Sequence, residues 1–185
     1  MKPESKVGIV GWGVYIPRFR IKIVDIASMW GFDVAIVNGL RMFEKAVGNV
    51  DEDAITIGYE ASKYALQRAQ IDLSKIGAVL MGTESKPYAV KPSTTIIADA
   101  LGIPPSRLTS DLEFACRAAG EGIRLSIGLI SSGMAKYALV IGSDTAQASP
   151  GDVLELTASS GAAAYILGPS EESVAVFEGL SLIHI

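Results

Sequence analysis

Cys116 is the residue of this sequence with the clearest capacity for covalent chemistry. It is the single cysteine among 185 residues and lies where a short apolar run meets a stretch of small residues with helical spacing. The free N–H groups at the start of a helix favour a thiolate, and small neighbours let a substrate approach the sulfur. Its position alone leaves two interpretations open, a nucleophile or a buried cysteine that acts as a small hydrophobic residue.

Glu84 is the second residue in an unusual place. It follows the apolar run GAVLMG directly and sits in a turn. Open parallel sheets build their sites at the carboxyl ends of strands, and Cys116 also follows a predicted strand, one strand–helix unit later. We therefore expect Glu84 and Cys116 on the same rim of one sheet, although glutamates in surface turns are common.

The elements that would position these two residues alternate along the chain. These elements are identified by the periodicity of apolar residues, two residues for a strand and 3.6 for a helix, and by the residue types expected at helix starts. Strands are expected at 6–11, 76–81, 109–114, 136–141, 161–167 and 173–177, and helices at 51–70, 93–101, 117–131 and, in two pieces that break near Gly31, over 21–47. Such alternation predicts an α/β fold whose mostly parallel sheet carries helices on both faces.

Composition excludes several classes of function. The chain is 49% hydrophobic and 19% charged, with a formal net charge of −4, so it offers no basic field for nucleic acid. No apolar run approaches the roughly 18 residues needed to span a bilayer, and the N-terminus lacks the features of a signal peptide. One cysteine permits no internal disulfide. We expect a cytoplasmic protein that binds neither nucleic acid nor membrane.

Other motifs carry less chemistry. The glycines of GIVGWG at 8–13 stand in the wrong order for a dinucleotide-binding loop, and DEDA at 51–54 reads as a helix start rather than a calcium loop. No cluster has zinc-ligand spacing, so no metal site is expected. Arg18, Arg20 and Lys22 are compatible with a phosphate-bearing ligand, but also with a solvated edge.

The last six residues, LSLIHI at 180–185, break the pattern of the preceding chain. They match, letter for letter, one reading frame of the transposase adapter used in sequencing libraries. We expect them to be a non-native tail, with Gly179 as the last native residue and no function for His184. An ordinary apolar strand is the alternative.

Four segments together resemble a known family: GIVGWGVYIPRFRI, GTES followed by KPS, EFACRAAGEGI, and YALVIGSDTAQASPGDVLELTASSGAAAYILG. They are similar to archaeal-type 3-hydroxy-3-methylglutaryl-CoA synthases, members of the thiolase-like superfamily, over residues 6–179. The resemblance implies a layered α/β/α/β/α fold built from two similar halves. Residues 1–179 would form the first, N-terminal half, with a mixed, mostly parallel sheet.

The resemblance also implies roles for particular residues. Cys116 matches the nucleophile that accepts an acyl group, and Glu84 matches the general acid/base in the GTE turn. Asp33, Val34 and Thr157 correspond to positions that line the acyl-CoA site. The catalytic histidine of the family would lie in the second half, beyond Gly179, so the chain alone should be inactive and expose an apolar face.

The implied reaction condenses acetyl-CoA with acetoacetyl-CoA in the mevalonate route to isoprenoids, without metal or redox cofactor. The implied protein partners are a second copy of the chain, an acetoacetyl-CoA thiolase and a small scaffold protein. Two alternatives remain. One is a thiolase or a β-ketoacyl-ACP synthase III-like acyltransferase, which would ordinarily lack the glutamate. The other is a non-catalytic thiolase-like subunit.

Overall fold

The computed structural model describes residues 5–179, so the predicted tail at 180–185 lies outside the described residues. The helices of the described part are α1 (Ile23–Trp30), α2 (Val34–Leu40), α3 (Ala54–Ala69), α4 (Ser93–Ala100) and α5 (Ala118–Ser131). The strands are β1 (Val7–Tyr15), β2 (Phe19–Lys22), β3 (Glu44–Val47), β4 (Ile76–Gly82), β5 (Leu108–Leu112), β6 (Tyr137–Thr145), β7 (Ser160–Pro169) and β8 (Ala175–Val176). Single turns of 3₁₀ helix, η1 to η4, lie at Leu73–Lys75, Ala115–Arg117, Val153–Leu156 and Ser170–Glu172.

The main sheet has six strands in the order β5-β4-β6-β7-β1-β8. Strand β4 is parallel to both β5 and β6, whereas β7 runs antiparallel to β6 and β1, and β8 antiparallel to β1. Four described strands (β1, β4, β5 and β6) therefore point one way and two point the other. This is the mixed, mostly parallel sheet that the sequence predicted.

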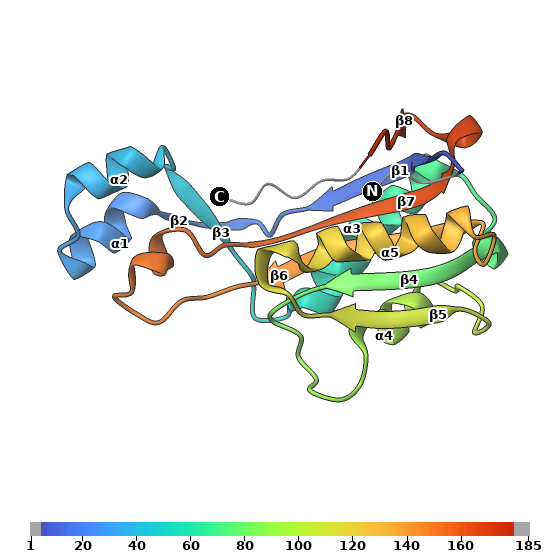
Figure 1. Cartoon of the computed structure of the whole chain (residues 1–185). Helices are drawn as coiled ribbons and strands as arrows, with labels where there is room; N and C mark the ends of the chain where they lie inside the picture. The colour runs from blue at the N-terminus through green and yellow to red at the C-terminus, as the bar shows by residue number, and fades with distance from the viewer. Residues whose placement is uncertain (1–4, 180–185) are drawn as a thin grey trace.

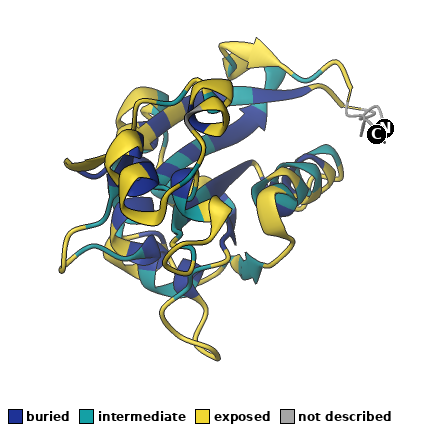
Figure 2. Ribbon diagram, turned by 90° about the vertical axis from the view of Figure 1, so that its left-hand side faces the viewer, coloured by how far each residue is buried: buried dark blue, intermediate teal, exposed yellow. Residues whose placement is uncertain are grey.

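Helices cover both faces of this sheet. Figure 1 shows α5 in front of the strands and α3 and α4 behind them. Alternation along β6 divides its side chains between the two layers: Leu139 and Ile141 join the core under α3 and α4, and Val140 joins the core under α5. In Figure 2 the buried residues gather on the strands, and the outer sides of the helices are exposed. Among the described residues, no helix has both the length and the apolar character to cross a membrane.

The glycines of β1 allow α3 to pack closely on the sheet. A Cβ added at Gly11 would lie 2.7 Å from the Cβ of Ala69, and one added at Gly13 would lie 2.5 Å from the backbone nitrogen of Ala65. Side chains at these two positions would push the helix away. Gly11 and Gly13 thus serve helix–sheet packing, whereas a Cβ at Gly8 would meet Ser173 and Ala175 at the edge beside β8.

Residues 19–47 differ in part from the prediction of two helical pieces. Helices α1 and α2 are present, and Gly31 separates them with a φ of 68°. However, β2 and β3 form an antiparallel pair that begins at Phe19 and ends at Val47. Contacts from distant segments stabilise this pair, because the Ser159 hydroxyl accepts the N–H of Ala46 at 3.0 Å. Tertiary contacts here override local helical periodicity.

The strand predicted at 173–177 is also shorter than expected, because β8 spans two residues. Its flanks still bond to β1: the Val174 N–H donates to the Ile9 carbonyl at 2.8 Å, and the Phe177 N–H to that of Val7 at 2.9 Å. The segment is therefore an irregular edge beside β1 rather than a full strand.

Candidate active site

Cys116 lies in the single turn η2, between the end of β5 and the start of α5. The predicted junction of strand and helix is therefore present, although the strand ends at Leu112 rather than at 114. No side chain of the described residues caps the N-terminus of α5. The N–H groups of its first turn therefore have no side-chain acceptor, and that of Ala118 bonds to the backbone carbonyl of Ala115.

The residue before the cysteine has a strained backbone. Ala115 has a φ of 46°, in the left-handed region that residues with a Cβ seldom adopt. The preceding Phe114 has φ −161° and ψ 47°. Such strain persists where the surroundings impose it, and it often occurs at functional sites. Here the strained residue lies where the chain turns from the end of β5 into η2, the turn that contains Cys116.

Glu84 contacts this same turn. It follows β4, the parallel neighbour of β5, and its carboxylate accepts a hydrogen bond from the backbone N–H of Ala115. Both Glu84 and Cys116 are exposed. The structure thus places the carboxylate and the thiol on the same rim. The Ala115 N–H that bonds to Glu84 belongs to the residue directly before Cys116.

Asp144, at the end of β6, holds the turn that carries Glu84. One oxygen, Oδ1, accepts the backbone N–H of Glu84 at 2.8 Å, the Ser85 hydroxyl at 2.8 Å and the Thr83 hydroxyl at 3.2 Å. Ser85 in turn accepts the N–H of Thr145 at 2.9 Å. A carboxylate bonded to three donors fixes a turn far more firmly than a sheet edge alone.

Cys116 opens into a cavity of about 640 Å³ on this rim. The size is within the range of small-molecule sites. Small residues form much of its wall. Two exposed apolar side chains also line it, Val14 of β1 and Ile16 just after that strand. The remaining lining residues are Arg20, Glu44, Ala46, Gly82, Ala115, Ala118, Ala119, Gly142, Ser143, Asp144, Ser159, Ser160, Gly161, Ala162 and Ala163.

The other predicted site residues lie apart from Cys116. Asp33 is exposed and caps α2 by accepting the N–H of Ala35 at 2.8 Å. Val34 is the first residue of that helix. Thr157 is exposed after η3, and its hydroxyl donates to the Leu154 carbonyl at 3.3 Å. Asp33 and Thr157 are not among the residues that line the cavity, so their role in acyl-CoA binding stays a prediction.

The basic residues near β2 have separate environments. Arg20 lines the Cys116 cavity and pairs with Glu44, with 3.5 Å between its Nε and the carboxylate. Arg18 lies over the ring of Phe19, 5.3 Å from the centroid.

Within residues 5–179, no three histidine, cysteine or acidic side chains gather as a metal site would require.

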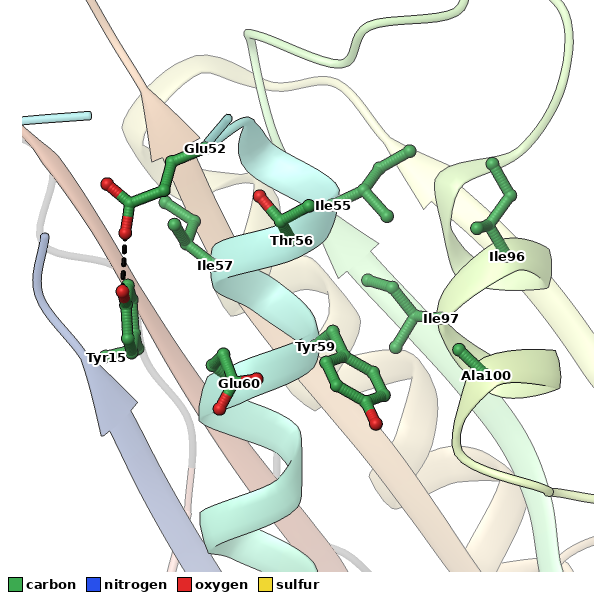
Figure 3. Close-up of a pocket in the computed structure, with 10 residues that line it drawn as sticks. All are labelled: Tyr15, Glu52, Ile55, Thr56, Ile57, Tyr59, Glu60, Ile96, Ile97 and Ala100. Atoms are coloured by element: carbon green, nitrogen blue, oxygen red, sulfur yellow. Dashed lines mark hydrogen bonds between the residues drawn. The ribbon is translucent and has the colours of Figure 1, made fainter. Parts of the chain in front are cut away.

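A second cavity, of about 350 Å³, lies between α3 and α4 and is lined mainly by apolar side chains (Figure 3). Neither Glu84 nor Cys116 lines it. At its edge the Tyr15 hydroxyl donates to Glu52 at 2.5 Å. This hydrogen bond to a carboxylate, with desolvation, raises the pKa of Tyr15 to about 12.

Sequence reasoning missed two parts of the site. Asp144 stands at the carboxyl end of a predicted strand, as Glu84 does, so the same rule could have identified it. The left-handed backbone of Ala115 had no such signal, because alanine rarely adopts it.

Comparison with known proteins identifies relatives of the chain. No protein-family model matches the chain. The chain is 61% identical over 176 residues to the hydroxymethylglutaryl-CoA synthase of Aeropyrum pernix, covering 95% of the chain and 49% of that protein. It is 56% identical over 180 residues to the synthase of Pyrococcus furiosus, covering 97% and 50%.

Solved structures give the same picture at the level of the fold. MvaS in complex with 3-hydroxy-3-methylglutaryl coenzyme A superposes with a TM-score of 0.82 at 29% identity, over 91% of this chain and 40% of that one. The priming β-ketosynthase of the R1128 polyketide pathway also gives a TM-score of 0.82, at 23% identity, over 92% and 52%. The fold is thus thiolase-like. Within that class, the chain is a homologue of the archaeal hydroxymethylglutaryl-CoA synthases and spans about half the length of the curated relatives it matches.

Proposed function

We propose that this chain is the N-terminal half of a hydroxymethylglutaryl-CoA synthase and supplies its nucleophile and its base. The observation that carries the proposal is the hydrogen bond from the Ala115 N–H to the Glu84 carboxylate, because it links the base to the residue before the thiol. Identity of 61% to a curated synthase supports the same reaction.

In the first step, the Cys116 thiolate attacks the carbonyl carbon of acetyl-CoA. The C–S bond to CoA breaks, CoA leaves as the thiol after taking a proton, and acetyl remains on Cys116 as a thioester. Backbone N–H groups at the start of α5, which have no side-chain acceptor, would stabilise the negative charge that develops on the thioester oxygen. The small residues around Cys116 leave room for the pantetheine arm in the cavity.

In the second step, Glu84 removes a proton from the acetyl methyl group. The resulting carbanion attacks the ketone carbon of acetoacetyl-CoA, whose oxygen takes a proton to become a hydroxyl. A histidine of the second half would assist at that oxygen. Water then cleaves the thioester, which releases 3-hydroxy-3-methylglutaryl-CoA and regenerates Cys116. Thr157, Asp33 and Val34 are proposed to contact the acyl-CoA substrates.

The test combines this chain with the remaining half of the Aeropyrum pernix synthase. We expect the combination to release CoA and form 3-hydroxy-3-methylglutaryl-CoA, and this chain alone to form none. Cys116→Ser should abolish acetylation by labelled acetyl-CoA. Glu84→Gln should keep acetylation but lower product formation by about 100-fold or more. The same assay compares residues 1–179 with the full chain, since we assign no role to residues 180–185.

Two outcomes would replace the proposal. If the combined halves took acetyl from acetyl-CoA but made only acetoacetyl-CoA, the protein would be a thiolase. If Cys116 accepted no acetyl group, it would be a non-catalytic thiolase-like subunit.

We further propose that the complete protein works in the cytoplasm as a homo-oligomer. An acetoacetyl-CoA thiolase and a small scaffold protein are its proposed partners, because the thiolase reaction supplies the second substrate. Co-purification of the complete protein with its thiolase tests this assignment.

A further inference from the structure

Two chain segments meet repeatedly on the rim that carries the candidate site. The base loop, residues 83–92, connects β4 to α4 and contains Glu84. The nucleophile segment, residues 111–116, contains Cys116. Besides the bond between Ala115 and Glu84, Lys86 of the base loop forms an ion pair with Glu113 of the nucleophile segment. A third contact, at Asp111, fixes the far end of the base loop.

Asp111 caps helix α4 from the neighbouring strand. Pro92 occupies the N-cap position of α4 and has no side chain that could accept a hydrogen bond. The carboxylate of Asp111 takes this role: Oδ2 accepts the N–H of Ser93 at 2.6 Å, and Oδ1 accepts the N–H of Thr94 at 3.0 Å and its hydroxyl at 2.9 Å. An anion at a helix N-terminus is stabilised both by these donors and by the helix dipole.

The base loop is thus fastened at both ends by carboxylates from different strands. Asp144 of β6 holds its first residues, and Asp111 of β5 holds the first turn of the helix that follows it. Strand β4, from which the loop leaves, lies between β5 and β6. Because Asp111 also precedes Cys116 by one short turn, a single residue connects the end of the base loop with the start of the nucleophile segment.

We propose that Asp111 is a positioning residue that keeps the Glu84 carboxylate on the Ala115 N–H, and so sets the placement of the base relative to Cys116. The inference rests on the proposed function for the roles of Glu84 and Cys116. Replacement of Asp111 by asparagine removes the charge and one acceptor oxygen. The first turn of α4 then loosens, and the base loop leaves Ala115 for part of the time.

The Ala115 amide proton is a direct reporter of this arrangement. Its hydrogen bond to the Glu84 carboxylate moves the amide proton resonance downfield, and NMR reads this shift directly. Asp144, Lys86 and Glu113 are the other charged groups around this turn, so Glu84→Gln identifies the part of the shift that belongs to the Glu84 carboxylate. We expect that variant to lose the shift.

Asp111→Asn should reduce the downfield shift of the Ala115 amide proton by about twofold or more, while the Ser93 and Thr94 amides exchange faster with solvent. Asp99→Asn, at an exposed position of α4, is the matched control and should leave both signals unchanged. Should Asp111→Asn fail to fold, Thr94→Val removes one of the three bonds to the carboxylate and should give a smaller loss of the Ala115 shift.

Faster exchange at Ser93 and Thr94 with an unchanged Ala115 amide shift would overturn the proposal, because Asp111 would then be a helix cap only. A wild-type chain whose Ala115 amide resonance equals that of Glu84→Gln would overturn it too. The NMR measurement uses no substrate. A chain that shows the expected amide shifts but takes no acetyl group would therefore refute the proposed function and leave the role of Asp111 in this geometry intact.

Discussion

The carboxylate of Asp144 lies 2.8 Å from the backbone nitrogen of Glu84, although sixty residues separate the two in the sequence. The neighbouring strands β4 and β6 bring them together, with Gly82 paired to Gly142 just before the two acidic residues. The orientation of Glu84 therefore depends on a side chain from another strand. A substitution of Asp144 should change the position of Glu84 although the Glu84 side chain itself is unaltered.

Asp144→Ala should destabilise the chain by about 1–3 kcal/mol, because it leaves three donors without their acceptor. One of them, the Thr83 hydroxyl, belongs to a residue that is 1% exposed. Urea unfolding measures the change. Asp99→Ala, on the exposed side of α4, should stay within about 0.5 kcal/mol of the wild type. Equal effects of the two substitutions would contradict this account of the turn.

Gly82→Ala should cost about 3 kcal/mol or more, because no flexible side chain can give way to the added methyl group. Its Cβ would lie 2.5 Å from the carbonyl carbon of Ala118, at the first turn of α5. The rate of Cys116 alkylation by iodoacetamide should change with it, since the helix start must move. Gly120→Ala is the control: a Cβ there meets nothing within 4 Å, so helix propensity should stabilise this variant by up to about 1 kcal/mol. Gly82→Ala with wild-type stability would refute the close packing.

Ala115→Gly should leave the free energy of unfolding unchanged or raise it by up to about 1 kcal/mol. Glycine relieves a left-handed backbone that costs alanine about 1–2 kcal/mol, which offsets its larger entropy in the unfolded state. Ala100→Gly, in the last turn of α4, should instead lower stability by about 0.5–1 kcal/mol. Thermal unfolding of the two variants side by side gives the comparison, and a destabilised Ala115→Gly chain would show that the φ of 46° is not strained.

Tyr15 should ionise at about pH 12 in the folded chain, because its hydroxyl donates to Glu52. A pKa above the unfolded value near 10 means that this interaction stabilises the fold fully below about pH 10. The contribution is lost as the pH rises through about 12. Tyrosinate absorbance should show that Tyr15→Phe removes the latest phase and that Glu52→Gln moves it to lower pH. A latest phase that persists in Tyr15→Phe would belong to another tyrosine.

The parts of the fold that follow from local sequence were predictable. Helix α3 carries its own signals: Asp53 and Thr56 form a reciprocal capping box at its start, and an apolar stripe repeats along it. The β2–β3 pair was not predictable from residues 19–47 alone, because Ala46 of β3 and Gly48 just after it donate to Ser159 and Ser160, more than a hundred residues away.

The candidate site likewise has one part that the sequence could predict and one part that it could not. Cys116 and Glu84 could be placed on one rim because each follows a predicted parallel strand, and topology then brings the strand ends together. Their direct connection through Ala115 could not be predicted. It needs a backbone conformation that alanine disfavours by itself, and bonds from Asp111 and Asp144 that sequence distance conceals.

The pairing of β1 with β7 also constrains the order in which the chain can fold. Val7 pairs with Pro169, so β1 has no main-sheet partner until nearly the whole described chain has left the ribosome. Strands β4, β5 and β6, by contrast, come from one uninterrupted stretch between Ile76 and Thr145. Closing the shorter loops costs less entropy, so the rim that holds Cys116 and Glu84 can assemble first, and β1 docks beside β7 afterwards.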